Sequence, residues 1–111
     1  MDSILTSVKK MLGISHDYTD FDPEIIMCIN SAFMILQQIG LGPQNGFSIE
    51  DDSAKWSDFI TSDKLEGIKS YMHLKVRLLF DPPQGSGQIE SINRLISELE
   101  WRLRYGNESE V

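Results

Sequence analysis

Residues 23–39, PEIIMCINSAFMILQQI, constrain the fold most strongly, because no charged residue follows Glu24 within them. Their apolar residues recur at three- and four-residue spacing, which predicts a helix with a wide apolar face. The opposite half holds Asn, Ser and Gln around Met27 and Met34, where an exposed helix normally carries Lys and Glu. This helix is therefore expected either to be buried within the fold or to meet another chain.

Three further stretches repeat this periodicity, so the chain is predicted to be all-α. The four predicted helices span residues 2–12, 23–39, 64–80 and 88–105. Asp22 is the expected N-cap of the second helix, and Leu79 and Leu95 are expected within the apolar stripes of the third and fourth. The middle segment, residues 47–63, allows one short strand or one helical turn.

A length of 111 residues with 41% hydrophobic residues is typical of one globular domain. We therefore expect residues 1–111 to form a single small bundle of about four helices. Residues 105–111 are expected to be a frayed tail. On the flanks of the last helix, three Glu-to-Arg pairs at i,i+4 favour the helical state: Glu90/Arg94, Glu98/Arg102 and Glu100/Arg104.

The segment LLFDPPQGSGQIE changes character more abruptly than any other part of the chain. Asp81 and Pro82 each precede a proline, which excludes them from the α region, and Pro82 and Pro83 have fixed φ angles. Gly85 and Gly87 leave the return of the chain permissive. A phosphate loop would follow a strand and carry a lysine, which this segment does not. It is predicted to be a corner between two helices and a hinge for assembly.

The residues that could carry catalysis or bind metal do not form a recognisable pattern. His16 and His73 belong to different predicted elements, and the single cysteine, Cys28, lies on an apolar stripe, whereas a zinc site needs three or four ligands. The acidic run at residues 17–24 lacks the spacing of a calcium loop. We therefore predict no catalytic residue, no metal site, no cofactor and no small-molecule substrate.

The charge balance excludes some classes of partner. A net charge of −7 argues against a protein that grips nucleic acid by neutralising phosphates, although an acidic surface suits a protein past which DNA moves. A single cysteine cannot form an internal disulfide, which fits either a reducing compartment or indifference to the redox state of the surroundings. There is no stretch of about 18 apolar residues, so no membrane span is expected, and residues 1–12 do not read as a signal peptide.

Two predicted helix faces carry residue types that are enriched at protein interfaces. Met27 and Met34 lie seven residues apart on the uncharged half of one helix. Trp101, flanked by Arg94 and Tyr105, lies opposite the apolar stripe of the last helix. The alternative is a larger core that wraps both faces. Because a small bundle with two such helices has more apolar surface than a monomer hides, we expect a homo-oligomer.

A resemblance to a known family rests on packing and turn residues. The segment SVKKMLGISHDYTDFDPEIIMCINSAFMILQQIG is similar to the opening of the tailed-phage head–tail connector family, small adaptor proteins also described as DNA-packaging proteins. YMHLKVRLLFDPP and ELEWRLRY resemble the close of small proteins from siphophage and prophage gene clusters. The shared features are a first helix that ends in Lys9–Ile14, an acidic turn at Asp17–Asp22, a long helix with Asn30 and Ala32, and Gly40.

This resemblance implies a structural virion protein without enzymatic activity or cofactor. It implies a helical subunit that forms a ring at the capsid neck, joins the portal to neck or tail proteins and extends the DNA channel. DNA would pass without sequence-specific binding, and the protein would reside in the host cytoplasm before assembly. The alternative reading is a small helical protein-interaction module or a regulatory dimer.

A ring requires a heterologous interface, in which one face meets a different face of the next copy. The acidic loop Glu50, Asp51 and Asp52 is predicted to face either the channel lumen or a partner. Lys75, within an apolar stripe, is predicted either to extend to solvent or pair with an acid of a neighbouring helix, or to contact another subunit. The residues expected at the self-association surface are Met27, Met34, Lys75, Arg94, Trp101 and Tyr105.

Overall fold

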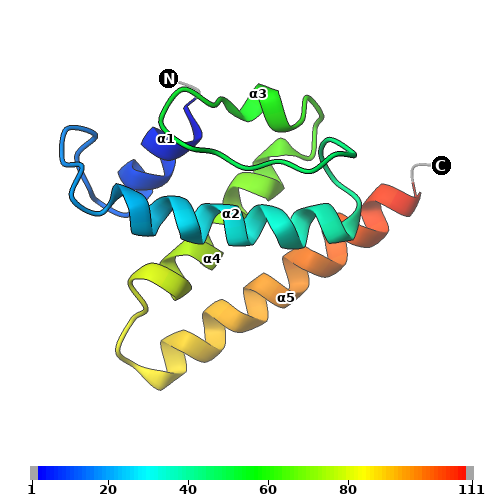
Figure 1. Ribbon diagram of the computed structural model, residues 1–111. Coiled ribbons are helices and arrows are strands. Elements are labelled where there is room, and N and C mark those ends of the chain that lie inside the picture. The colour runs from blue at the N-terminus through cyan, green and yellow to red at the C-terminus, as the bar shows by residue number, and fades with distance from the viewer. Residues whose placement is uncertain (1–2, 110–111) are drawn as a thin grey trace.

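The computed structural model describes residues 3–109, with side chains as far as Arg104, and within this range the protein is all-α. No β-sheet occurs in the described residues, so the predicted small helical bundle is confirmed (Figure 1). The helices are α1 (Ile4–Met11), α2 (Asp22–Ile39), α3 (Trp56–Phe59), α4 (Leu65–Phe80) and α5 (Ser86–Ser109).

The core forms where α4 packs against both α2 and α5, with α1 and α3 covering its other side (Figure 1). Helix α2 supplies the largest share of the fully buried side chains, as its wide apolar face predicts. Helix α5 contributes little to it: in the part with described side chains only Ile96 and Leu103 are buried. The fully buried hydrophobic side chains are Ile4, Val8, Ile25, Ile29, Ala32, Phe33, Leu36, Ile68, Tyr71, Met72 and Val76.

The start of α2 differs from the sequence prediction. Phe21, not Asp22, is the N-cap, and Asp22 is the first helical residue, followed by Pro23. The prediction for Asp22 was wrong because a buried lysine of α1 engages its carboxylate, as described below. At the other end Gly40 adopts a φ of 108°, a left-handed conformation that favours glycine and closes the helix.

The middle segment between α2 and α4 contains a helical turn, α3, and no strand. Asn30 of α2 holds this segment, because its Nδ2 donates to the carbonyl of Ile49 (3.0 Å) and its Oδ1 accepts from the Ile49 amide (2.8 Å). Phe33 anchors the rest through ring contacts with Phe47 and Phe59 at centroid distances of 4.9 and 4.6 Å. Two side chains of α2 thus hold in place a segment that forms no strand of its own.

The corner after α4 follows the prediction in its first half only. Asp81 leaves the helical region with φ −144° and ψ 69°, as a residue before proline must. Helix α5 begins at Ser86, two residues earlier than predicted, so Gly87 lies in its first turn. Gly85 and Gly87 do not adopt a positive φ. The conformationally free part of the corner therefore ends before Ser86 and is shorter than predicted. The role of the corner as a hinge for assembly stays a prediction.

The far end of α5 also differs from the prediction, because its backbone is helical to Ser109, past the expected end at residue 105. The predicted fraying stays a prediction, and residues 110–111 lie outside the described range. Of the three expected Glu–Arg pairs, an ion pair forms between Glu98 and Arg102 (2.7 Å). Glu100 instead accepts a hydrogen bond from the buried Tyr71 hydroxyl (2.9 Å), which ties α5 to α4.

Two leucines predicted in apolar stripes, Leu79 and Leu95, are each 49% exposed. The expectation that these two leucines join the core was wrong, because helical periodicity shows which side of a helix faces the core but not how wide the buried strip is. The core is narrow at the corner end of α4 and along α5, and it reaches only the centre of each stripe.

Candidate interaction surfaces

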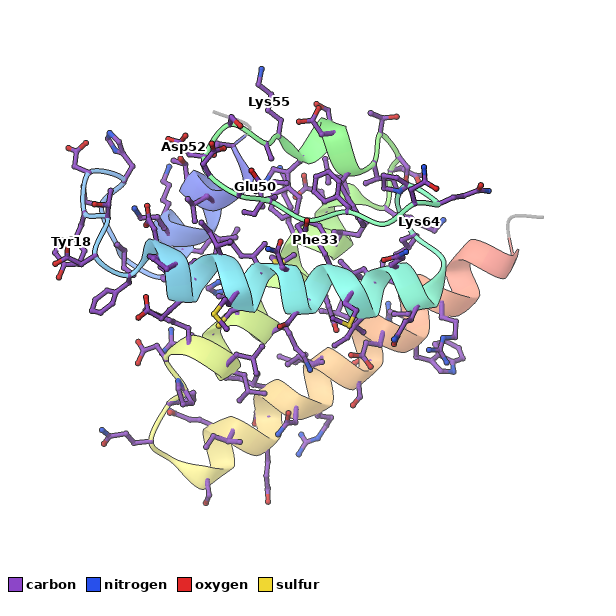
Figure 2. The ribbon with its side chains drawn as sticks, in the orientation of Figure 1. Tyr18, Phe33, Glu50, Asp52, Lys55 and Lys64 are labelled. Carbon is purple, nitrogen blue, oxygen red and sulfur yellow. The ribbon has the colours of Figure 1, made fainter. Side chains whose placement is uncertain are left out.

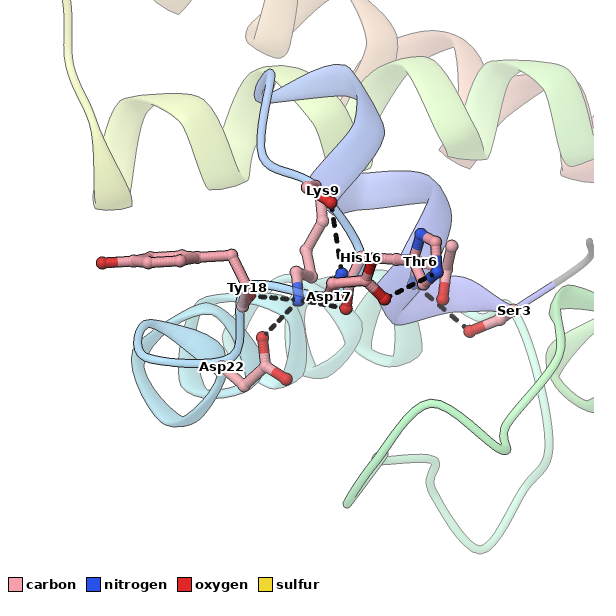
Figure 3. A network of polar contacts seen from close by, with 8 residues as sticks. Ser3, Thr6, Lys9, His16, Asp17, Tyr18 and Asp22 are labelled. Atoms are coloured by element: carbon pink, nitrogen blue, oxygen red, sulfur yellow. Dashed lines mark hydrogen bonds and ion pairs between the residues drawn. The ribbon is translucent and has the colours of Figure 1, made fainter.

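The first feature is a buried charge that the sequence analysis did not single out. The Lys9 side chain is 2% exposed, and its Nζ lies 2.8 Å from Asp22 Oδ1 (Figure 3). Nζ also donates to the carbonyl oxygens of Tyr18 (2.7 Å) and His16 (3.3 Å). The Asp22 contact is an ion pair without the angular geometry of a hydrogen bond. A buried ammonium requires such partners because its desolvation is costly.

These contacts fasten the loop at residues 13–21 and the first turn of α2 onto α1. The sequence carried a signal for this arrangement, since Lys9 follows Leu5 by four residues and so shares the apolar face of α1. Lys10, on the neighbouring position, is exposed. A lysine on a buried face predicts an acidic partner, and Asp22 is the acid that the fold brings to it.

Next to this ion pair lies an acidic cleft of about 580 Å³. The predicted acidic loop, Glu50 to Asp52, forms one wall, and its three carboxylates are exposed (Figure 2). Asp51 accepts hydrogen bonds from the Ser53 hydroxyl and amide (2.6 and 2.9 Å), which lower the pKa of the Asp51 carboxyl. The lining residues are Leu5, Thr19, Asp22, Pro23, Ile26, Glu50, Asp51 and Asp52.

The uncharged outer face of α2 is exposed. Met27 and Met34 are 70% and 58% exposed, and Ser31 and Gln38 beside them are also exposed. Of the two alternatives drawn from the sequence, burial of this face within the chain does not occur. At 100° per residue Pro23 lies on the same face as both methionines. Because Pro23 also lines the acidic cleft, the cleft and the methionine face are continuous.

The outer face of α5 exposes an aromatic residue beside arginines. Trp101 is 63% exposed, and Arg94 and Arg104 are exposed on the same side of the helix. A shallow hollow of about 200 Å³ is lined by Ser97, Glu100, Trp101 and Arg104. The Tyr105 side chain, predicted to join this face, lies outside the described residues.

The remaining predicted residues are not brought into these surfaces. Lys75 on α4 is half-buried, and it forms no ion pair with any other residue in the described range. The predicted pairing with an acid of a neighbouring helix is therefore absent from that range, and its role in a subunit contact stays a prediction. The corner at residues 81–87 borders a separate hollow with Arg77, Gln88, Ser91 and Ile92.

Burial shifts the pKa values of two helical side chains, Cys28 and His73, in the direction that favours their neutral forms. Desolvation raises the pKa of the Cys28 thiol, which lowers its nucleophilic fraction at neutral pH. Desolvation, with a smaller effect of Arg77, lowers the pKa of His73, whose buried Nδ1 has no hydrogen-bond partner among the described residues. Residues 3–109 contain no group of three or more His, Cys, Asp or Glu arranged to hold a metal.

The described residues thus define a small all-α protein that exposes two faces rich in interface-type residues. The chain belongs to the phage connector family: a family model described as phage connector protein matches residues 4–110. It is accordingly a phage structural protein of the virion neck that interacts with other head or tail proteins. No curated protein and no solved structure matches the chain significantly. None of the described helices combines the length and apolar character needed to cross a bilayer.

Proposed function

We propose that this protein forms a homo-oligomeric ring at the capsid neck that joins the portal to the next neck or tail component and extends the DNA channel. The observation that carries the proposal is the exposure of Met27, Met34 and Trp101 on two different helices. Large side chains of these types are costly to leave in water and are enriched where proteins meet. Two separate faces are what a heterologous, ring-closing contact requires.

The charge of the chain supports a role as a conduit for DNA. At a net charge of −7 the subunit repels the phosphate backbone, so DNA can move through a ring without being held. In such a ring the acidic loop at residues 50–52 faces either the lumen of the DNA channel or a partner protein. Before assembly the subunit resides in the host cytoplasm, where capsids are filled.

The proposal is tested by removing the gene from the phage and supplying it from a plasmid. Without the protein, filled heads and free tails should accumulate unjoined, and wild-type protein should restore infectious particles. Trp101→Ala and Met34→Lys should fail to restore them while folding normally by circular dichroism. Thr61→Lys, at an exposed position outside both faces, serves as the matched control.

Normal head–tail joining by both Trp101→Ala and Met34→Lys would exclude these faces from assembly. Sizing the purified protein over a concentration series separates the ring from the alternative of a regulatory dimer. A ring gives a closed high-order species, whereas a dimer saturates at two copies.

A further inference from the structure

The acidic cleft and the methionine face form one continuous surface, here called the acceptor surface. Its members are Pro23, Met27, Met34, Glu50, Asp51 and Asp52. One end of this surface is anionic and the rest is uncharged. No residue in the described range forms an ion pair with Glu50, Asp51 or Asp52. Three adjacent carboxylates without counter-ions leave a negative potential that favours a cationic partner.

The outer face of α5 is complementary to the acceptor surface. This arginine–tryptophan face consists of Arg94, Ser97, Trp101 and Arg104. Neither Arg94 nor Arg104 forms an ion pair with another residue of the described chain, whereas Arg102, on the flank, is engaged by Glu98. Trp101 thus lies between two arginines that form no ion pair within the described range, although the Glu100 carboxylate lines the same hollow. The methionine stripe is neutral and ends in three anions, so the arginines can complement it.

The two surfaces also agree in length. At about 1.5 Å per residue, Arg94 to Arg104 extends roughly 15 Å along α5, and Pro23 to Met34 extends roughly 16 Å along α2. Arg104 follows Trp101 by one helical turn. If Arg104 lies against the acidic loop, Trp101 therefore reaches the stripe at Pro23 and Met27.

One chain cannot bring its own acidic loop and the far end of its α5 together. The acidic loop lies beside the start of α2, whereas the segment around residue 101 lies at the orange-to-red end of α5, on the opposite side of the molecule (Figures 1 and 2). The longest dimension of the chain is 43 Å. A contact between the two surfaces must therefore join different copies and repeats from each copy to the next.

We propose that the acceptor surface binds the arginine–tryptophan face of a second copy of this chain, with Arg104 against the carboxylates of residues 50–52 and Trp101 on the methionine stripe. This inference rests on the proposed ring and identifies its subunit contact. It assigns the acidic loop to the neighbouring subunit and not to the channel lumen. Like charges placed at such a contact weaken it strongly, and restoring opposite charges recovers it.

A reciprocal charge exchange tests this contact. Arg104→Glu and Asp52→Arg are made singly and together in the full-length protein, and self-association is measured by sedimentation velocity over a concentration series. Asp52 is preferred to Asp51 because Asp51 holds the turn through Ser53. Each single variant should weaken association by roughly tenfold or more, and the double variant should return to within about threefold of wild type.

Two control variants match these changes in charge. Arg102→Glu reverses an arginine on the flank of α5 that already has a partner, and Glu66→Arg reverses an exposed acid at the start of α4. Both should associate as wild type does. When the single, double and control variants are supplied to a phage that lacks the gene, their infectious titres should rank in the same order as their self-association.

The outcomes separate this contact from the ring itself. A wild-type protein that stays monomeric at every concentration and is absent from purified virions would overturn both the proposed ring and the proposed subunit contact. A ring that forms normally with Arg104→Glu and with Asp52→Arg would overturn the contact and leave the ring. Normal association of Asp52→Arg together with retention of DNA in the assembled neck would overturn the contact in favour of a lumen-facing loop.

Discussion

Replacing Lys9 by methionine tests whether its buried ion pair holds the start of α2 in place. Lys9→Met keeps the length and volume of the side chain but removes the ammonium, which is 2% exposed. The change leaves the Asp22 carboxylate without its counter-ion at 2.8 Å and the Tyr18 carbonyl without its donor at 2.7 Å. Removing one partner of a buried pair costs about 3–5 kcal/mol.

The Asp22 side chain is 22% exposed, so water can solvate part of the stranded charge. The expected loss is therefore at the lower end, about 3 kcal/mol of the free energy of unfolding. Against the 5–15 kcal/mol that stabilises a typical domain, this loss is large, and it lowers Tm by roughly 12 °C.

Urea denaturation followed by circular dichroism measures this loss directly. Lys10→Met is the matched control, because Lys10 is exposed on the same helix, and it should change the stability by less than about 0.5 kcal/mol. In a double-mutant cycle with Asp22→Asn, the losses should be non-additive by about 2 kcal/mol. A loss of under about 1 kcal/mol for Lys9→Met, with additive losses in the cycle, would refute the reasoning.

The other predictions concern the loop contacts and the histidine of α4. Asn30→Ala removes both hydrogen bonds that hold the middle segment and should cost about 2 kcal/mol in urea denaturation; a loss as small as that of an exposed asparagine would count against this role. Gly42→Ala should cost about 3 kcal/mol, because φ is +84° and the new Cβ would lie under 3.0 Å from ring atoms of Phe59, whereas Gly13→Ala, at φ +82° with no atom within 4 Å, should cost only about 1 kcal/mol by the same measurement. Equal losses for the two alanines would show that the ring contact is not limiting. The folded state lowers the pKa of His73, so the unfolded chain binds more protons and stability should fall as the pH drops from about 7 towards 5. His73→Gln should flatten that part of the Tm–pH profile, and an unchanged profile would contradict this assignment.

Much of the fold follows from local patterns in the sequence. Three- and four-residue periodicity predicts four of the five helices, because an amphipathic stripe must be buried whatever it packs against. The absence of charge after Glu24 predicts an uncharged outer face on α2, and that face is exposed. Gly13, Gly40 and Asp81 lie just after the last residues of α1, α2 and α4, since backbone restrictions depend on the residue and its neighbours in the chain.

Tertiary structure decided the features that depend on distant residues. The exposure of Leu79 and Leu95 follows from the extent of the core, which no single helix specifies. The position of Lys9 on a buried face predicts an acidic partner, but the sequence does not specify that this partner is Asp22, 13 residues away. The loop at residues 50–52 and the start of α2 line one cleft, because Asn30 holds the loop against α2. Periodicity determines which side chains share a face, but only the packing of helices decides which faces stay exposed and which charges they meet.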